Sequence, residues 1–339
     1  MFLLRVPSCP SWIEISSFVV FRGQDFSEAD SSVETHPSRT TSPTIGTALG
    51  QAIGTLAPHS PSARADAEIL LGYVLGKPRH WPYVWGDDVF SPSEYDRFQH
   101  LVDRRVSGVP VAYLTGRRWF WSLDLLVTPD VLIPRPETES LVEAALEIIP
   151  KAARWRVADL GTGAGPVALA LARERPGCRI TATDISAPAL EAAKRNARRH
   201  KIENIAFQEG SWFDALADVM ADASGETDRA DCRSRYHVIV SNPPYVAADD
   251  PHLSRGDVRF EPVLALAGGP DGLDPIRHIA RGARAHLMQG GWLLLEHGYD
   301  QGKRVRALLD GFRYERITAL RDDGGRERIT LGRYTLDQR

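Results

Sequence analysis

A stiff, proline-rich segment follows a strand-like apolar stretch in the second half of the chain. The segment reads Asn242-Pro243-Pro244-Tyr245. Each proline fixes its own φ angle, restricts the residue before it and lacks an N–H, so the backbone here is extended and offers carbonyl acceptors without competing donors. The Asn242 side chain adds another carbonyl, and the Tyr245 ring can stack on a flat group. This pattern favours a wall that binds a planar –NH2 group. The alternative is a plain strand terminator.

A second distinctive stretch, "DLGTGAG", lies at an expected strand-to-helix turn. Its glycines let the backbone approach a ligand closely, at the strand end where open α/β sheets bind nucleotides. A tight turn without a ligand is the alternative. The spacing G-x-G-x-G, without a following Lys-Ser/Thr, matches neither a Walker loop nor a dinucleotide fingerprint. The turn residues of this candidate site are Gly161, Thr162, Gly163, Ala164 and Gly165.

An acidic residue ends the next expected strand. There Asp184 can accept hydrogen bonds from both hydroxyls of a ribose. Asp184 or Ser186 can also cap the following helix, and the two roles are compatible. The order of the glycine turn and Asp184 resembles the start of the class I methyltransferases, which use S-adenosyl-L-methionine.

A methyl donor beside residues 242–245 would explain why this segment presents only hydrogen-bond acceptors to an –NH2 group. An amide or aryl amine nitrogen is a poor nucleophile because its lone pair is delocalised. Accepting both N–H hydrogens favours charge build-up on nitrogen, and alignment with the sulfonium methyl supplies up to about 7–11 kcal/mol. No strong base is needed, because the proton can leave after methyl transfer. The tetrapeptide is similar to that of methyltransferases acting on adenine in DNA, on guanine or adenine in RNA, or on glutamine in proteins.

Several longer stretches narrow the substrate. Between about residues 45 and 334 they are, in order, "RADAEILL", "PVAYLTGRRWFWSLDLLVTPDVLIPRPETE", "DLGTGAGPVALALA", "SNPPYVAADDPHL", "GDVRFEP" and "LLLEHGYDQG". Together they resemble the protein-(glutamine-N5) methyltransferases of peptide chain release factors, the HemK/PrmC family. The resemblance implies a Rossmann-like class I methyltransferase fold, S-adenosyl-L-methionine as cofactor, and methylation of the glutamine in the Gly-Gly-Gln loop of a release factor.

The resemblance also implies roles for individual residues. The glycine turn, Asp184 and Asn242 would bind the cofactor, with Trp212 beside its adenine; Ser211 stands where many relatives have Asp. Residues 242–245 would hold the glutamine amide and be catalytic. The remaining residues expected to line the substrate pocket are Arg135, Pro136, Glu137 and Glu139. The alternative is that they form only a connector, with acidic residues at the start of a helix.

Rival functions are distinguishable. A sibling enzyme methylates a glutamine of a large-subunit ribosomal protein, but "RFEP" and "EHG" favour the release-factor enzyme. A DNA adenine methyltransferase needs a target-recognition domain and a positive face, whereas the formal net charge is -3. A non-enzymatic binding module would lack affinity for S-adenosyl-L-methionine.

Composition indicates a soluble globular protein, with 43% hydrophobic and 25% charged residues. The basic run "KRNARRH" (194–200) is interpreted as a solvated helix face. Three separated cysteines form neither a disulfide framework nor a zinc pattern and suit a reducing cytoplasm. No apolar run reaches the roughly 20 residues of a membrane helix. We expect a cytoplasmic monomer that binds no metal, nucleic acid or membrane.

The chain divides into four predicted parts. Residues 1–44 form a disordered leader, 45–115 a helical substrate-recognition domain, 116–138 a hairpin connector and 139–339 the methyltransferase domain. Two helices of the second part are expected to open with a Ser-Pro cap, at Ser60 and Ser91. In the last part strands and helices alternate, which predicts an α/β, doubly wound, mostly parallel sheet closed by a hairpin. Residues 218–234 are predicted to form a surface insertion.

Overall fold

The computed structural model describes residues 42–216 and 235–335. Predictions for residues 1–41 and for the insertion at 218–234 lie outside the described residues. Thr44, which the sequence analysis assigns to the leader, instead caps the first helix by accepting a hydrogen bond from the backbone N–H of Thr47 at 3.3 Å.

The first described part is helical, as predicted. Its helices are α1 (Ile45–Leu56), α2 (Ala63–Leu75), α3 (Pro92–Val106) and α4 (Val111–Thr115), with a 3₁₀ turn at Trp81–Tyr83. Apolar residues at helical spacing give these helices a common core, in which Leu56, Leu70 and Phe98 are fully buried. We call residues 45–115 the helical region.

One of the two Ser-Pro predictions is confirmed and the other is wrong. Ser91 caps α3 in a complete capping box with Glu94, and Pro92 is the first helical residue. Helix α2 begins later than predicted, with Ser62 at its N-cap. The Ser60 hydroxyl lies before the helix, where it accepts the Ser62 backbone N–H at 3.2 Å and donates to Asp66 Oδ2 at 2.7 Å.

A short hairpin connects the helical region to the sheet. Strands β1 (Arg117–Phe120) and β2 (Leu123–Leu126) pair antiparallel, and a 3₁₀ turn at Pro136–Thr138 leads into α5 (Glu139–Ile148). Phe120, Leu123 and Leu125 of the hairpin are buried against the main core.

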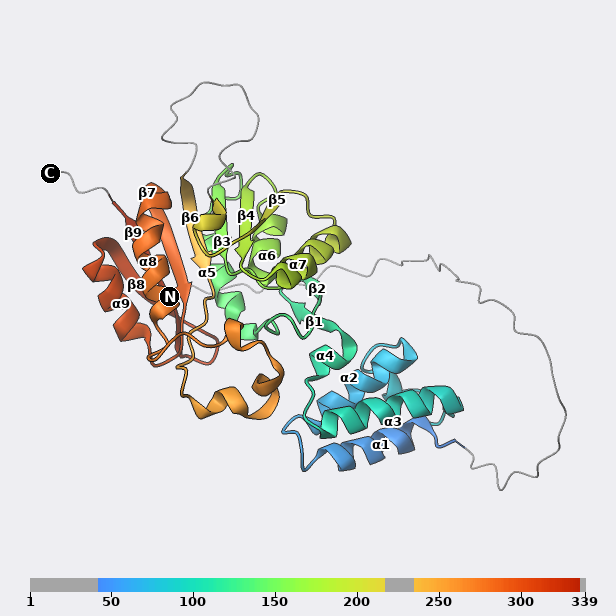
Figure 1. Ribbon diagram of the computed structural model, residues 1–339. Coiled ribbons are helices and arrows are strands. Elements are labelled where there is room, and N and C mark those ends of the chain that lie inside the picture. The colour runs from blue at the N-terminus through green and yellow to red at the C-terminus, as the bar shows by residue number, and fades with distance from the viewer. Residues whose placement is uncertain (1–41, 217–234, 336–339) are drawn as a thin grey trace, which may run out of the picture. The chain divides into compact units, whose positions relative to one another are not determined.

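The remaining elements form one sheet of seven strands with flanking helices (Figure 1). In chain order they are β3 (Arg156–Leu160), α6 (Pro166–Glu174), β4 (Arg179–Asp184), α7 (Ala187–His200), β5 (Ile205–Glu209), β6 (Tyr236–Ser241), α8 (Asp274–His286), β7 (Leu287–Glu296), α9 (Gly302–Gly311), β8 (Tyr314–Arg321) and β9 (Glu327–Tyr334). The strand order is β5-β4-β3-β6-β7-β9-β8, and only β9 pairs antiparallel to its neighbours. The predicted α/β fold class is confirmed.

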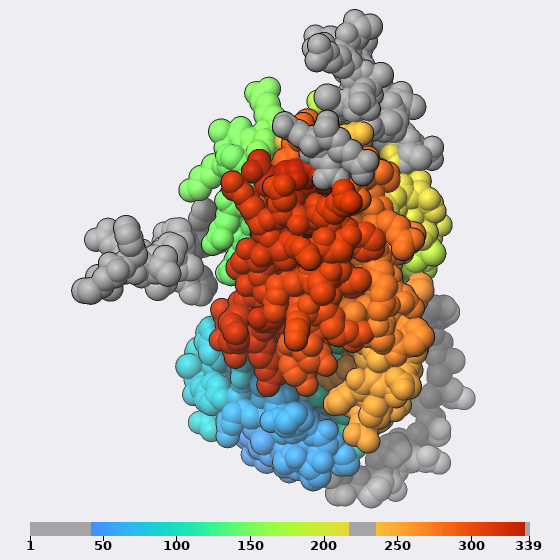
Figure 2. Space-filling model, turned by 90° about the vertical axis from the view of Figure 1, so that its left-hand side faces the viewer, coloured from blue at the N-terminus to red at the C-terminus, as the bar shows by residue number. Residues whose placement is uncertain are grey.

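Both faces of the sheet are covered, which explains why the central strands β3, β4 and β6 are almost entirely buried. Alternate residues enter different cores: Val157 and Val238 pack with α5 and α6, while Ala158 and Ile239 pack with α8 and α9. Figure 2 shows the C-terminal part of the sheet region, in orange and red, as one continuous surface. Within residues 42–216 and 235–335, no helix has the length and apolar character to cross a bilayer.

The strand order reverses between β3 and β6, which are parallel neighbours. From β3 the chain winds outward through β4 to β5, and from β6 it winds the other way to β7. In this register Leu160 lies opposite Ser241, and the Ser241 hydroxyl donates to the Leu160 carbonyl at 2.7 Å. The glycine turn after β3 and Asn242 after β6 therefore leave the sheet side by side, at the crevice where such sheets bind ligands.

Candidate active site

The glycine turn after β3 needs its glycines for both conformation and space. Gly161 and Gly165 have φ angles of 72° and 86°. A Cβ on Gly161 would lie 3.3 Å from the Trp212 ring, and one on Gly165 would lie 3.0 Å from a Leu169 methyl. The first glycine therefore lets Trp212 approach the turn, and the last lets α6 pack closely.

A buried carboxyl holds the turn from inside. The Thr162 hydroxyl and the Ala168 backbone N–H both donate to Asp159 Oδ2, at 2.7 and 3.1 Å. Burial raises the pKa of Asp159 to about 6, although these two hydrogen bonds oppose the rise. Asp159 thereby joins the end of β3 to the start of α6.

Ser186 takes the capping role that the sequence left open between it and Asp184. The Asp184 carboxylate accepts the backbone N–H of Gly163 at 2.8 Å and that of Ser186 at 2.9 Å. Ser186 is the N-cap of α7 and accepts from Ala189. Burial raises the pKa of Asp184, while the backbone donors lower it. Each carboxylate oxygen keeps a lone pair for a further donor.

Asn196 is a site residue that the sequence analysis missed. Its run was interpreted as a solvated face, but Asn196 is fully buried on α7. It accepts the Leu126 N–H at 2.7 Å and donates to the carbonyls of Leu126 and Ala164, both at 3.0 Å. One amide therefore ties the glycine turn to the end of the hairpin.

Two cavities meet at Asn242. The first lies among the glycine turn, Asp184 and Trp212, and its lining is mostly apolar, including Val131, Ile185 and Leu264. The second lies on the other side of the proline segment and is lined by Pro243, Tyr245 and neighbouring residues. Asn242 and Arg135 line both cavities. A group bound in one can therefore face a group bound in the other across Asn242.

The proline segment is anchored at both ends. Asn242 Nδ2 donates to Thr138 Oγ1 at 3.1 Å, and its Oδ1 accepts no hydrogen bond from the described part of the chain. The Tyr245 hydroxyl donates to Glu296 Oε1 at 3.4 Å, and the Tyr245 carbonyl accepts from Gln301 Nε2 at 2.9 Å. Burial raises the pKa of Tyr245, so its hydroxyl remains a donor.

The structure brings only one of the four expected connector residues to the cavities. Arg135 lines both and forms an ion pair with the buried Glu261, whose other oxygen accepts the Ile133 N–H at 3.0 Å. Pro136 and Glu137 are exposed. Glu139 lies at the hairpin, where its carboxylate accepts the Trp121 N–H at 2.7 Å. These last three do not line either cavity among the described residues.

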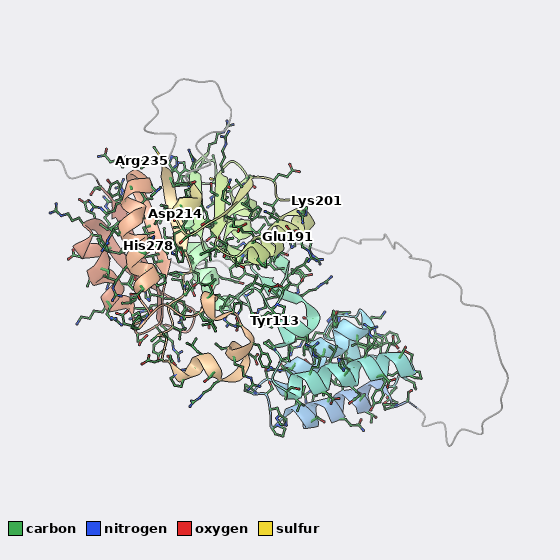
Figure 3. All side chains as sticks on the ribbon, viewed as in Figure 1. Tyr113, Glu191, Lys201, Asp214, Arg235 and His278 are labelled. Carbon is green, nitrogen blue, oxygen red and sulfur yellow. The ribbon has the colours of Figure 1, made fainter. Side chains whose placement is uncertain are left out.

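The helical region touches the walls of both cavities. The Tyr113 hydroxyl, on α4, donates to the carbonyl of Val131, a wall residue of the first cavity, at 2.6 Å (Figure 3). Arg105 on α3 pairs with Asp257 at 2.6 Å, and Arg259 donates to the Ser107 carbonyl at 2.8 Å. Residues 251–265, which supply part of the second cavity, are thus held from the helical region.

Three further residues at the site were not predicted from the sequence: Thr138, Glu261 and Glu296. Each lies inside a stretch that carries the family resemblance, "LIPRPETE", "GDVRFEP" or "LLLEHGYDQG". The sequence therefore showed that these stretches belong to the family pattern, but it could not predict that these side chains contact the proline segment and Arg135. In residues 42–216 and 235–335, no group of three or more His, Cys, Asp or Glu side chains is placed to hold a metal ion.

Comparisons with known proteins agree with this geometry. Residues 47–116 match the PrmC N-terminal domain and residues 140–255 the methyltransferase small domain. A release factor glutamine methyltransferase of Xylella fastidiosa is 49% identical over 80% of this chain and 93% of its own length, and one of Pseudomonas aeruginosa is 50% identical over 82% and 95%. The chain belongs to the release factor glutamine methyltransferase family. The family predicted from the sequence is confirmed.

A solved relative exists in the same family. The release factor-specific protein-(glutamine-N5) methyltransferase of Alicyclobacillus acidocaldarius shares 27% identity over 62% of this chain and 99% of that chain, with a TM-score of 0.36.

We predict that Asn196→Ala loosens the glycine turn selectively. The change leaves the buried Ala164 carbonyl and both backbone groups of Leu126 without their partner, at a cost of about 1–3 kcal/mol for each unsatisfied group. Amide hydrogen exchange should rise at residues 125–127 and 161–168. Asn204→Ala is the matched control, because Asn204 also donates to three backbone carbonyls, those of Ala172, Arg175 and Cys178. It should raise exchange near residues 172–178 only; identical exchange maps would contradict the assignment.

We also predict that Asp159 makes stability depend on pH. Its folded pKa of about 6 lies above the ordinary value of 3.8, so its contribution is complete below about pH 4 and is lost as pH rises through 6. The loss is about 3 kcal/mol at 1.36 kcal/mol per pKa unit. In Asp159→Asn, the unfolding free energy from urea titrations should fall by about 2.4 kcal/mol less than in the wild type between pH 4 and 7, because part of the full loss occurs below pH 4. Parallel curves for the two proteins would refute this.

Proposed function

We propose that this protein transfers a methyl group from S-adenosyl-L-methionine to the side-chain amide nitrogen (N5) of the glutamine in the Gly-Gly-Gln loop of a peptide chain release factor. The observation that carries the proposal is the position of Asn242 between two cavities, with its Oδ1 free to accept. The family names of the relatives support the same reaction and substrate.

The first cavity fits S-adenosyl-L-methionine. The Asp184 carboxylate, already fixed by two backbone donors, keeps lone pairs for the ribose hydroxyls. Trp212 and Ile185 offer flat and apolar surface for adenine. The space beside Gly163, where an added Cβ would meet nothing within 4 Å, lets the cofactor lie close to the backbone of the turn. When bound, the cofactor supplies an electrophilic methyl group on its sulfonium.

The second cavity suits the acceptor amide. Asn242 Oδ1 and the backbone carbonyls of the proline segment accept its two N–H hydrogens, and neither Pro243 nor Pro244 presents a competing donor. The Tyr245 ring flanks the flat amide. Accepting these hydrogens favours positive charge on nitrogen as the N–CH3 bond forms and the sulfonium C–S bond breaks. The proton then leaves the nitrogen, and the methylated amide is neutral again.

The partner we propose is the release factor itself, recognised as a folded protein, with no direct contact to nucleic acid. The contacts of Arg105 with Asp257 and of Arg259 with the Ser107 carbonyl, which join the helical region to residues 251–265, support a role for the helical region in that recognition. We further propose a monomer acting in the cytoplasm. The low cysteine content supports that compartment.

We predict that Gly161→Ala weakens S-adenosyl-L-methionine binding about tenfold or more, which corresponds to at least about 1.4 kcal/mol. The new Cβ would press on the Trp212 ring in the cofactor cavity. Gly76→Ala is the matched control: Gly76 has a similar φ of 63°, but a Cβ there meets nothing within 4 Å. Both changes impose about the same backbone strain. Calorimetry should show a raised Kd for the first variant alone; equal affinities would argue against a cofactor in this cavity.

The reaction is tested with radiolabelled S-adenosyl-L-methionine offered with three acceptors. These are a release factor, the same factor with its loop glutamine changed, and duplex DNA. Label should enter the unaltered factor only, because that acceptor alone carries the loop glutamine. Label on the altered factor or on DNA would overturn the proposal.

Asn242→Ala in the same assay tests the observation on which the proposal rests. Removing the side-chain acceptor should reduce methyl transfer at least about a hundredfold, as loss of one well-placed hydrogen-bonding group does in other active sites. Cofactor affinity, measured separately, should survive. Transfer near the wild-type rate would refute the amide-binding role.

A further inference from the structure

A glutamine side chain needs more than a wall of hydrogen-bond acceptors, because two methylene groups precede its planar amide. The proline segment suits the amide, whereas the methylenes require apolar surface. In the second cavity Leu253, Val258 and Leu266 supply such surface. The amide nitrogen can be aligned with a methyl donor only if the groups around the rest of the side chain are held in place as well.

Val258 lies in a short 3₁₀ helix, Gly256–Phe260, which is fixed on both sides of it. On one side, the Asp257 carboxylate accepts a hydrogen bond from Arg105 Nη1 at 2.6 Å. On the other side, the buried Glu261 is held by a backbone N–H and an arginine of the connector. One wall residue of the acceptor cavity therefore lies between two charged anchors, and the first of them belongs to the helical region.

Arg105 is itself fixed by the helical region, in which it is buried. Its Nε donates to Asp66 Oδ2 at 2.7 Å, its Nη2 to Ser60 Oγ at 3.3 Å and its Nη1 to the Val109 carbonyl at 3.3 Å. Asp66 is buried too, and its Oδ1 accepts from the Ser62 hydroxyl at 2.9 Å. A buried guanidinium is tolerated only with such partners, and these partners leave it a single orientation.

Polar contacts join the helical region to this wall. In the described part of the chain, the apolar core of the helical region draws only on residues 45–114 and does not extend to residues 251–265. Besides the ion pair just described, Arg259 donates to the Ser107 carbonyl at 2.8 Å, and Gly108 leaves the room for it, since a Cβ there would lie 2.3 Å from Arg259 Nη2. Apolar contact is non-directional, whereas paired charges fix the register of two surfaces. The junction therefore determines orientation.

We propose, building on the function above, that Arg105 is a positioning residue for methyl transfer, which through Asp257 sets Val258 against the methylenes of the acceptor glutamine. Arg105 touches neither the substrate nor the cofactor in this arrangement, because it lines neither cavity. Breaking its contact with Asp257 should misplace the amide nitrogen relative to the methyl donor. The cofactor cavity should stay intact, since neither partner of the contact belongs to its wall.

Two substitutions break the contact without leaving a buried charge unpaired. Asp257→Ala removes a carboxylate whose side chain is 45% exposed, so the fold should persist. Arg105→Lys keeps a cation beside Asp66 but lacks the planar fork that reaches two carboxylates at once. Glu327→Ala is the matched control. It breaks an ion pair of similar length, 2.7 Å to Arg306, which joins α9 to β9 and lines neither cavity.

The first measurement is single-turnover methyl transfer by the full chain at saturating S-adenosyl-L-methionine, over a range of release-factor concentrations. At saturating release factor, Asp257→Ala and Arg105→Lys should each be slower by about tenfold or more, the cost of a misplaced group. The double variant should be no slower than the slower single variant, because both changes break one contact. Cofactor Kd should not change, and Glu327→Ala should match the wild type. A normal saturated rate with only a raised half-saturating concentration would make the contact part of docking and overturn the inference.

A second readout needs no acceptor. In protein with ¹³C-labelled valine methyl groups, the Val258 signals should move or broaden in Arg105→Lys, while those of Val238 in β6 stay in place. Arg105→Lys is the decisive variant here, because Asp257 is the chain neighbour of Val258 and Arg105 is not. Glu327→Ala should leave both sets of signals unchanged. Unchanged Val258 signals in Arg105→Lys overturn the inference, whether or not the wild type methylates a release factor. The expected changes without methyl transfer by the wild type would instead count against the proposed substrate alone.

Discussion

The site depends on one pairing, that of β3 with β6 in parallel register. Leu160 lies opposite Ser241, and the Ser241 hydroxyl locks the two strand ends together. Because the chain reverses its winding direction here, no helix connection crosses the crevice above these two ends. The glycine turn and the proline segment therefore emerge as neighbours, and a methyl donor on one strand end meets an acceptor on the other without any adjustment of the sheet.

A wall made of acceptors has a structural cost. Two consecutive prolines remove the backbone donors that would otherwise anchor the segment to its surroundings. The anchoring falls instead to side chains from distant parts of the chain: Thr138 holds Asn242, while Gln301 and Glu296 hold Tyr245. This explains why buried polar residues gather behind the segment, and why a carboxyl as poorly solvated as Glu296 is tolerated there.

Local patterns in the sequence predicted most of the fold and the two ends of the site. A few neighbouring residues are enough to recognise the alternation of strands and helices, the glycine turn, Asp184 and residues 242–245. The supporting residues do not. Asn196 sits in a run whose three arginines are exposed, and Glu139 is an acidic residue of the connector whose carboxylate binds the hairpin instead of a pocket. Such roles arise only when segments far apart in the chain meet, so periodicity and spacing carry no trace of them.

The supports of the acceptor cavity suit a substrate that is a loop of a folded protein. The outer wall of the acceptor cavity, residues 251–265, is held by contacts with two other parts of the chain. The end of α3 contributes Arg105 and the Ser107 carbonyl, and the connector contributes Arg135, which pairs with Glu261. A wall supported in this way changes shape only if the helical region moves as well. A large folded partner that contacts the helical region can therefore influence the cavity that receives its glutamine, whereas a free amide cannot. The contacts between the helical region and residues 251–265 therefore serve both recognition of the partner and alignment of its amide.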